Sequence, residues 1–447
     1  MKKLMLICAP VSSRSGYGDH ARDLVRSLIE HNKYDIKIQD VPWGETSRDA
    51  LDNKLDKNII DCILLEPKID KEPDVYIDIR IPNEFQTHGK LNIGITAGIE
   101  TTAVSNAWIE GCNKMDLVIV PSEHSKQGFV SAFYEKMQQL PNGQQQKVGE
   151  LKLEKPIDVL FEGADENIYK PINNSSLDLV DDIKEDFCFL HVGMWGKGGY
   201  GEDRKDIAKT IKIFYESFAN KKEKPALILK TSGATFSILD REECLRKINQ
   251  IKSMFPKDWS LPNVYLLHGS LTPNQMNKLY NHPKIKCFVS LTHGEGFGRP
   301  LLEASMVGLP VIASAWSGHL DFLSDTDSIL LGGELVKVPK SQVWKDIIIG
   351  DAQWFNANET QSYKALNYCF QNYNEVKQKA LNLMKINREK FTLNKMTNKF
   401  DKIISPIIEK IPSEVQLQLP KLKKIGNQKP SKIQLPKLKK VTNEVTV

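Results

Sequence analysis

The sequence predicts an α/β protein with two domains, each a parallel sheet covered by helices. The chain has 447 residues, which is more than one ordinary domain holds. Short apolar runs alternate with amphipathic segments along most of its length, as they do in successive βαβ units. The third observation is residues 292–310, THGEGFGRPLLEASMVGLP, where a glycine turn joins an apolar run to a helix-like segment.

The composition is that of a soluble protein, with 40% hydrophobic and 26% charged residues. No run of about 18 apolar residues is present, so no transmembrane helix is expected. The opening MKKLMLICAP has too short an apolar run for a signal peptide, and we interpret it as a first strand. Seven scattered cysteines without paired spacing indicate reduced thiols, so we predict a cytoplasmic protein without a disulfide framework, a metal site or a cofactor.

In the N-terminal half, residues 3–9 form the expected first strand and are followed by SSRSGYGDHARDLVRSLIE. This segment predicts a turn and an amphipathic helix, in which Gly16 and Gly18 let the backbone approach a ligand. The polar run at 138–149 predicts an exposed loop. Further strands are expected at 36–41, 62–65, 75–79, 93–97 and 117–120.

The C-terminal half repeats this alternation. Strands are expected at 157–161, 187–192, 226–230, 264–268, 287–291 and 311–315. Residues 376–411 are mostly helical in pattern, and their last part, 396–408, is the expected final helix.

The glycine turn at 295–298 carries the clearest chemistry. A turn that opens a helix aims backbone N–H groups and the positive helix end at an anion, typically a phosphate. Glu295 and Glu303 bracket the turn, with seven residues between them. A phosphate repels carboxylates, so we expect these two to accept hydrogen bonds from hydroxyl groups, such as those of a sugar or a ribose.

The stretch from Glu295 to Ser314, EGFGRPLLEASMVGLPVIAS, resembles the signature of glycosyltransferase family 4. These are retaining enzymes among the glycosyl transferases of group 1. The resemblance implies a GT-B fold, with two Rossmann-like domains facing across a cleft, and sugar transfer from a nucleotide-sugar, UDP- or GDP-linked, without a metal. It places Glu295 by the donor sugar and Glu303 by the ribose. The donor-binding segment between them is Phe297, Gly298, Arg299, Pro300 and Leu301.

The same resemblance implies roles in other loops. Many relatives place an arginine and, a few residues later, a lysine on the donor diphosphate, but this chain has Met194 at the position of the arginine. We assign the diphosphate to Lys205, with Arg204 second, and count both with Glu295 as catalytic residues. Gly16, by its loop position, is expected at the donor. Ser270 and Leu271 are expected to contact the nucleotide base through their backbone.

Two stretches depart from the family pattern. Many relatives place a histidine near the exocyclic hydroxyl of the donor sugar, but the corresponding ITAGIETT has none, and Glu100 stands there instead. A pentose donor without that hydroxyl is one explanation and a shifted alignment is another, so both hexosyl and pentosyl transfer remain open. Gly18, Glu100 and His319 are expected contacts of the sugar or the acceptor.

We predict a first, acceptor-binding domain at 1–170 and a donor-binding domain at 171–392, since EGADENIYKP resembles the family turn between them. A helix at 393–411 should cross back to the first domain, followed by a tail at 412–447. From Ser413 on, eight lysines oppose two glutamates, a net charge of +6. The tail repeats QLPKLKKIGNQ as QLPKLKKVTNE and is expected to be disordered. It is either a solubilising extension or an arm for nucleic acid or another anionic surface.

The main prediction is a retaining glycosyltransferase whose acceptor is a glycan, a lipid-linked sugar or a small molecule. One alternative is a transferase that modifies a DNA base and holds the polymer with its basic tail. Another is a different GT-B enzyme, an epimerase or a phosphorylase. A non-catalytic GT-B binding protein is the remaining alternative, which the two intact glutamates argue against.

Overall fold

The computed structural model describes residues 2–66, 68–140, 144–233 and 235–412. The predicted disordered tail, 413–447, lies outside them. Residues 1–411 form one unit that contains two parallel sheets, each of six strands. This confirms the predicted α/β class. We call each sheet with its covering helices the first and the second domain.

The first sheet has the strand order β2-β1-β3-β4-β5-β8, and all its neighbours pair in parallel. Its strands are β1 (Lys3–Ala9), β2 (Tyr34–Asp40), β3 (Val75–Ile79), β4 (Leu91–Ile95), β5 (Leu117–Val120) and β8 (Ile157–Val159). Parallel strands buried on both faces are nearly continuous apolar runs, which is why most were visible in the sequence. The strand predicted at 62–65 is wrong, because this segment makes only an isolated bridge between Ile38 and Ile63.

The helices of the first domain cover its sheet on both faces. The apolar side of α1 packs on Met5 and Ile7 of β1, while Trp108 and Phe129 pack on the other face near β5. The helical segments are α1 (Gly16–His31), α2 (Lys57–Ile60), η1 (Pro82–Glu84), α3 (Asn106–Cys112) and α4 (Glu123–Ser131). Serine side chains cap α1, α3 and α4, in each case accepting a backbone N–H of the first turn.

The second sheet has the order β11-β10-β9-β12-β13-β14, again parallel throughout. Its strands are β9 (Cys188–Met194), β10 (Ala226–Ser232), β11 (Val264–Leu267), β12 (Ile285–Ser290), β13 (Val311–Ser314) and β14 (Ile329–Leu331). Numbered within the sheet, this is the order 3-2-1-4-5-6 of a doubly wound nucleotide-binding fold. The order reverses between β9 and β12.

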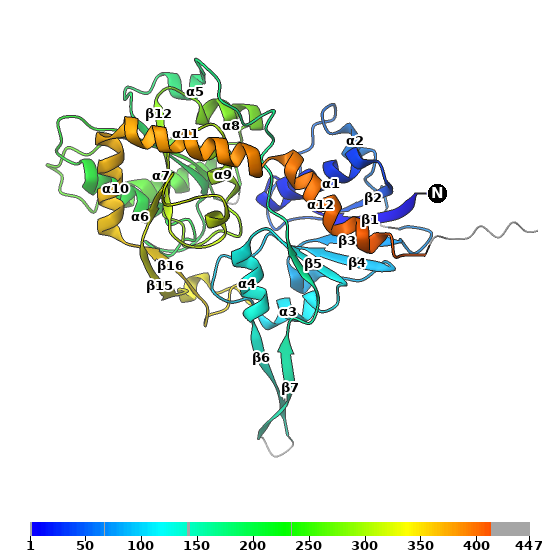
Figure 1. Cartoon of the computed structure of the whole chain (residues 1–447). Helices are drawn as coiled ribbons and strands as arrows, with labels where there is room; N and C mark the ends of the chain where they lie inside the picture. The colour runs from blue at the N-terminus through cyan, green and yellow to red at the C-terminus, as the bar shows by residue number, and fades with distance from the viewer. Residues whose placement is uncertain (1, 67, 141–143, 234, 413–447) are drawn as a thin grey trace, which may run out of the picture. The chain divides into compact units, whose positions relative to one another are not determined.

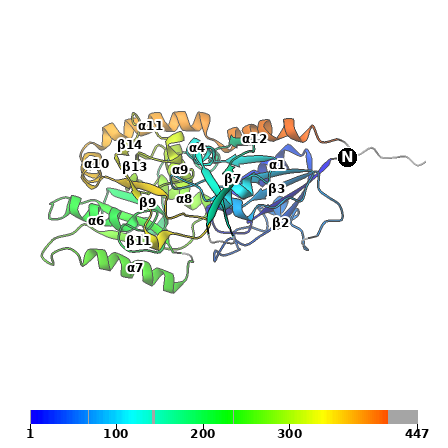
Figure 2. The ribbon, with the colours of Figure 1, turned by 90° about the horizontal axis from the view of Figure 1, so that it is seen from below.

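Side chains alternate between the two faces of this sheet. Ile228 and Phe288 belong to the core under α8, α9 and α11, whereas Leu227 and Val289 belong to the core under α6, α7 and α10. Figure 2 shows α6 and α7 on one side of the sheet and α11 on the other. The helical segments are α5 (Asp178–Asp181), α6 (Ile207–Phe218), α7 (Ile238–Lys252), α8 (Pro273–Tyr280), α9 (Arg299–Met306), η2 (Gly318–Asp321), η3 (Lys340–Gln342), α10 (Glu359–Gln371) and α11 (Tyr373–Lys390). A small antiparallel pair, β15 (Gly333–Lys337) with β16 (Gln353–Ala357), follows β14.

The chain passes between the domains twice, and the two passages bond to each other. Ala164 N–H donates to Phe391 O at 3.0 Å, and Leu393 N–H donates to Ala164 O at 2.8 Å. A Cβ on Gly163 would lie 2.6 Å from Leu393 Cα, so this close approach requires glycine. The last helix, α12 (Leu393–Ile408), then packs Phe400 and neighbouring apolar residues into the core of the first domain (Figure 1).

The loop predicted at 138–149 is wrong for residues 138–139 and 145–149, although the predicted exposure of most of them is confirmed. These residues lie in two antiparallel strands, β6 (Phe133–Gln139) and β7 (Gln145–Lys152), that extend away from the first sheet in Figure 1. Most of their side chains are exposed on both faces. A strand without a buried face has no alternation of apolar and polar residues, so its sequence lacks the pattern by which strands are recognised.

Candidate functional site

The reversal of strand order in the second sheet positions the first group of predicted residues. Loops that leave neighbouring strands on either side of such a reversal diverge, and the crevice between them binds ligands in open α/β sheets. Glu295 lies in the loop after β12, and Arg204 and Lys205 lie in the loop after β9. The fold therefore brings Glu295 to Arg204 and Lys205, which precede it by 91 and 90 positions in the sequence.

Glu295 accepts from both cations. Lys205 Nζ lies 2.5 Å from Glu295 Oε1, and Arg204 Nη1 lies 3.3 Å from Glu295 Oε2. Arg204 also donates to Gly294 O at 3.2 Å, and its Nε lies 3.5 Å from Glu100 Oε1. The structure thus places the three predicted catalytic side chains in one ion-pair network, with the predicted contact Glu100 at its edge.

Charge and burial oppose each other in this network. Burial alone would raise the pKa of Glu295, but Lys205 and Arg204 outweigh it and lower that pKa to about 2. Burial also lowers the pKa of Lys205 below its usual value, although Glu295 acts in the opposite direction. Glu295 is therefore an ionised carboxylate at neutral pH and is not a proton donor.

The amino end of α9 faces the same crevice. Gly298 precedes the helix with φ +97°, a conformation that favours glycine, and offers no side-chain cap. Among the described residues, the amide N–H groups of Phe297, Gly298 and Arg299 find no acceptor. Three open amides at a positive helix end form a site for an anion.

Glu303 lies one turn into α9 and is held by protein groups. Tyr280 Oη donates to its Oε2 at 3.2 Å, and Arg299 Nε donates to its Oε1 at 3.1 Å. Arg299 Nη1 also lies 2.7 Å from Asp23 Oδ2 on α1 of the first domain. Burial raises the pKa of Glu303, against the opposing charge of Arg299. A ribose hydroxyl would have to share or replace one of these donors.

The other predicted residues of this segment divide by burial. The side chains of Phe297 and Leu301 are both 2% exposed and belong to the core of the second domain, so only their backbone can meet a donor. Arg299 and Pro300 are half-buried. His319 is fully buried and bonds Ser314 O at 2.7 Å through Nε2. Its Nδ1 lacks a partner among the described residues, and a Cβ on Gly298 would lie 3.0 Å from its Cβ.

The two glycines of the first loop differ. A Cβ on Gly16 would meet no atom within 4 Å, so the position is open to a ligand. A Cβ on Gly18 would lie 2.2 Å from Ser13 O, so the local packing requires glycine at this position whether or not a ligand binds. Ser270, from the loop after β11, accepts from Arg14 Nη1 at 2.9 Å, and Leu271 packs at the edge of the second core.

The two domains are in close contact around the site. Ser122 Oγ donates to Gly296 O at 2.6 Å, and Cβ atoms on Gly294 or Gly296 would collide with the backbone of Glu100 and Ala97. Glu295 and Glu303 are each only 6% exposed. In this arrangement protein atoms of both domains cover the two carboxylates almost completely.

Two contributors were missed by the sequence reasoning. Ser317 Oγ accepts Glu295 N–H at 2.9 Å, and Ser317 itself has φ +84° and ψ −164°. His191 is fully buried. A Cβ on Gly193 would lie 3.2 Å from His191 Nε2 and 3.3 Å from Lys205 Cδ, so the two side chains border the same glycine. Burial lowers the pKa of His191 to about 4. No sequence signal marks either residue, because neither the positive φ of a serine nor the burial of a histidine in a strand can be read from the residue type.

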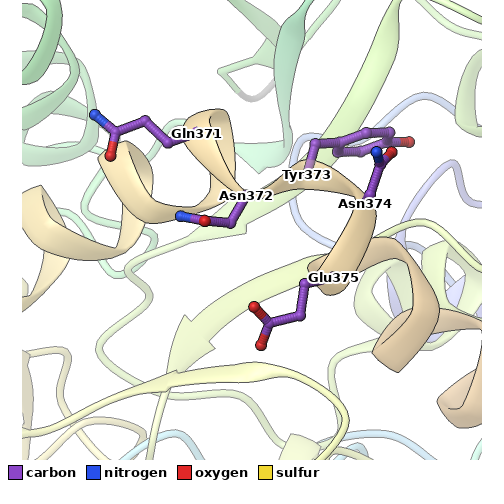
Figure 3. A pocket seen from close by; sticks show the side chains of 5 residues that line it. All are labelled: Gln371, Asn372, Tyr373, Asn374 and Glu375. Atoms are coloured by element: carbon purple, nitrogen blue, oxygen red, sulfur yellow. The ribbon is translucent and has the colours of Figure 1, made fainter.

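Two hollows of the surface lie elsewhere. One of about 320 Å³ lies at the junction of α10 and α11, where Figure 3 shows the five residues from Gln371 to Glu375 that line it. The other, about 170 Å³, lies between Tyr215 and Pro262. Neither contains a residue of the candidate site. In the described part of the chain, no group of three His, Cys, Asp or Glu side chains could hold a metal, and no helix is long and apolar enough to cross a membrane.

Part of the chain matches a known protein family. Residues 204–352 match the family described as glycosyl transferases group 1, a segment that begins at Arg204 and includes Glu295 and Glu303. No curated protein matches the chain.

Solved structures share the fold at low identity. Sucrose-phosphate synthase from Thermosynechococcus elongatus is 11% identical with a TM-score of 0.59, covering 92% of this chain and 100% of that one. A glycosyltransferase from Rickettsia africae is 13% identical with a TM-score of 0.59, covering 92% and 99%. HepE from Anabaena, solved with UDP and glucose, is 13% identical with a TM-score of 0.56, covering 90% and 100%. These likenesses show the predicted GT-B fold.

Proposed function

We propose that this protein is a retaining glycosyltransferase of family 4 that transfers a sugar from a UDP- or GDP-linked donor to an acceptor hydroxyl. The observation that carries the proposal is the Glu295 carboxylate, kept ionised between Lys205 and Arg204 beside the open amides of α9. HepE, which was solved with UDP-glucose, supports a UDP-linked donor. The match of residues 204–352 to group 1 glycosyl transferases supports the reaction class.

In the proposed reaction, the donor diphosphate lies on the amino end of α9. The bond between the anomeric carbon and the diphosphate oxygen breaks, and the acceptor oxygen bonds the same carbon from the same face. The acceptor proton passes to the leaving diphosphate, so no protein base is needed. The amides of Phe297 and Gly298, with Lys205 and Arg204, would stabilise the charge that develops on the diphosphate without a metal.

Glu295 has a different role in this reaction. A carboxylate whose pKa is about 2 cannot donate a proton at neutral pH. It accepts hydrogen bonds from the donor sugar and stabilises positive charge on the anomeric carbon as the diphosphate departs. Glu303 binds the ribose, in place of one of its present donors.

The test is a panel of UDP- and GDP-sugars that includes hexoses and pentoses. Binding is measured by thermal shift, since a donor that binds the folded state raises the melting temperature. Turnover is measured as release of the nucleoside diphosphate, with water as the default acceptor. Glu295→Gln should keep donor binding and lower turnover by about 10²–10³. A wild-type protein that neither binds nor hydrolyses any donor would refute the proposal.

The proposal has two versions that differ in the acceptor. In the first, the acceptor is a glycan, a lipid-linked sugar or a small molecule. The net charge of +6 in residues 413–447 favours DNA as the second, because a basic segment binds a phosphate backbone without regard to sequence. Removal of these residues should abolish transfer to duplex DNA in the second version and leave transfer to a small acceptor unchanged in the first.

We place this reaction in the cytoplasm. All seven cysteines are free, and six of them are buried. Burial raises the pKa of several of these thiols, which keeps them protonated and unreactive. Reduced, buried thiols are typical of proteins in a reducing compartment.

A further inference from the structure

Lys230 is a half-buried cation for which the described residues offer no anion. It is the fifth residue of β10, and its ammonium makes neither an ion pair nor a hydrogen bond within the part of the chain that the structure describes. Its nearest aromatic neighbour is Phe236, whose ring centre is 5.8 Å from Nζ. Burial lowers the pKa of Lys230 to about 8. A buried ammonium without a counter-charge destabilises the free protein, so its presence requires a reason.

Two buried lysines of this domain are neutralised by carboxylates. Lys205 pairs with Glu295 at 2.5 Å, and Lys209 pairs with Asp206 at 3.0 Å. Asp240, the next carboxylate after Lys230 along the chain, is engaged elsewhere. It accepts Gly233 N–H with both oxygens and contacts His268 Nε2 at 2.7 Å. The charge of Lys230 is therefore left for something that is not part of the described chain.

The position of Lys230 in the sheet connects it to the candidate site. Alternate residues of a strand share a face, so Lys230 points to the same side as Ile228, which is the side covered by α8 and α9. It pairs with Val192 of β9 and Leu267 of β11, each within two residues of a strand end. Since the strands are parallel, these ends share one edge with the amino end of α9.

The space beside this edge is open. Gly269, in the loop after β11, has φ +114°, and a Cβ there would meet no atom within 4 Å. Phe236 is 41% exposed, and its ring lies edge-on to His268 with 6.2 Å between centres. An anion reaching this edge would meet the Lys230 ammonium beside the Phe236 ring.

We propose that Lys230 binds a phosphate group of the nucleotide donor. The inference rests on the proposed function and adds to it a residue that the glycine-turn signature does not contain. Lys205 and Arg204 are shared with Glu295, whereas the whole charge of Lys230 is available to the ligand. The cost of burying this cation in the free protein is recovered when the phosphate binds.

The experiment compares Lys230→Met and Lys230→Arg with wild type by calorimetry, using UDP, UMP and uridine, or the guanine series if GDP binds better. Methionine keeps the volume of the side chain and removes the charge. Lys257→Met, at an exposed lysine of the same domain, is the matched control. Lys230→Met should weaken binding of the diphosphate about tenfold or more, and binding of the nucleoside should be unchanged. Lys230→Arg and the control should bind as wild type.

Two further measurements separate this role from a structural one. Without ligand, Lys230→Met should melt at the same temperature as wild type or higher, because it removes an uncompensated buried charge. Wild-type affinity for UDP should fall as the pH rises through about 8, where Lys230 loses its proton, and Lys230→Arg should show no such fall.

Equal UDP binding by Lys230→Met and wild type would overturn the inference while leaving the proposed function intact. An equal loss of uridine and UDP would also overturn it, since the effect would then not involve phosphate. If wild type binds none of the nucleotides, both the inference and the proposed function fail.

Discussion

Lys205 Nζ and Glu295 Oε1 lie 2.5 Å apart, in a contact between loops that follow two neighbouring strands of the second sheet. The pair is almost excluded from solvent, with Lys205 9% and Glu295 6% exposed. Each charge is tolerated there because the other is present. This mutual dependence makes the network testable by stability as well as by activity.

The first prediction is a double-mutant cycle on this pair. Glu295→Gln leaves Lys205 and Arg204 facing each other without a carboxylate and should destabilise the protein by about 3 kcal/mol. Lys205→Met should cost less, because Arg204 still pairs with Glu295. The loss of unfolding free energy in the double variant should be smaller than the sum of the two single losses by about 1–3 kcal/mol, measured by urea unfolding. Strict additivity would show that the two charges do not depend on each other.

The second prediction concerns the backbone at Ser317. Its φ of +84° with ψ of −164° is a conformation that only glycine adopts without strain. Ser317→Ala and Ser317→Gly both lose the hydroxyl that accepts Glu295 N–H, so they differ only in their tolerance of this backbone. The alanine variant should be less stable than the glycine variant by about 1–3 kcal/mol in chemical unfolding. Equal stability of the two would mean that the backbone relaxes without cost.

The third prediction is a pH dependence at Glu162. Burial raises the pKa of this carboxyl to about 7, although Arg299 acts in the opposite direction. Between about pH 4.5 and 7 the unfolded chain releases this proton while the folded protein keeps it, so stability falls as the pH rises through this window. Glu162→Gln should match wild type at pH 4.5 and exceed its unfolding free energy by about 3 kcal/mol at pH 8. Parallel stability profiles for the two proteins from pH 4.5 to 8 would contradict the shift.

The fourth prediction concerns the place where the two inter-domain passages bond. A Cβ on Gly163 would lie 2.6 Å from Leu393 Cα and 2.7 Å from Thr392 O. Gly163→Ala should therefore separate the passages and destabilise the protein by about 1–3 kcal/mol. Gly149→Ala is the matched control, because its Cβ would meet nothing closer than Lys136 Cδ at 3.9 Å. Thermal unfolding of the two variants checks this, and equal melting temperatures would count against the contact.

Where the chain buries an apolar face, its sequence was informative. Runs such as those of β1, β5 and β12 are buried on both sides, so they contain enough apolar residues to predict parallel strands and the α/β class. The glycine turn before α9 was also visible, because a helix entry with φ +97° at Gly298 selects glycine directly. The hairpin β6–β7 was not visible, since its strands cover no core.

The sequence by itself determined which residues have the chemistry for the site: two glutamates around a glycine turn and an arginine–lysine pair in another loop. These properties are local, because helix entry and side-chain charge depend on adjacent residues. Only the tertiary structure decided that Lys205 meets Glu295, that Arg299 joins Glu303 to Asp23, and that Lys230 has no carboxylate partner among the described residues. Those relationships depend on strand order and on the contact between the two domains, which bring together residues far apart in the chain, and no pattern along a single segment encodes them.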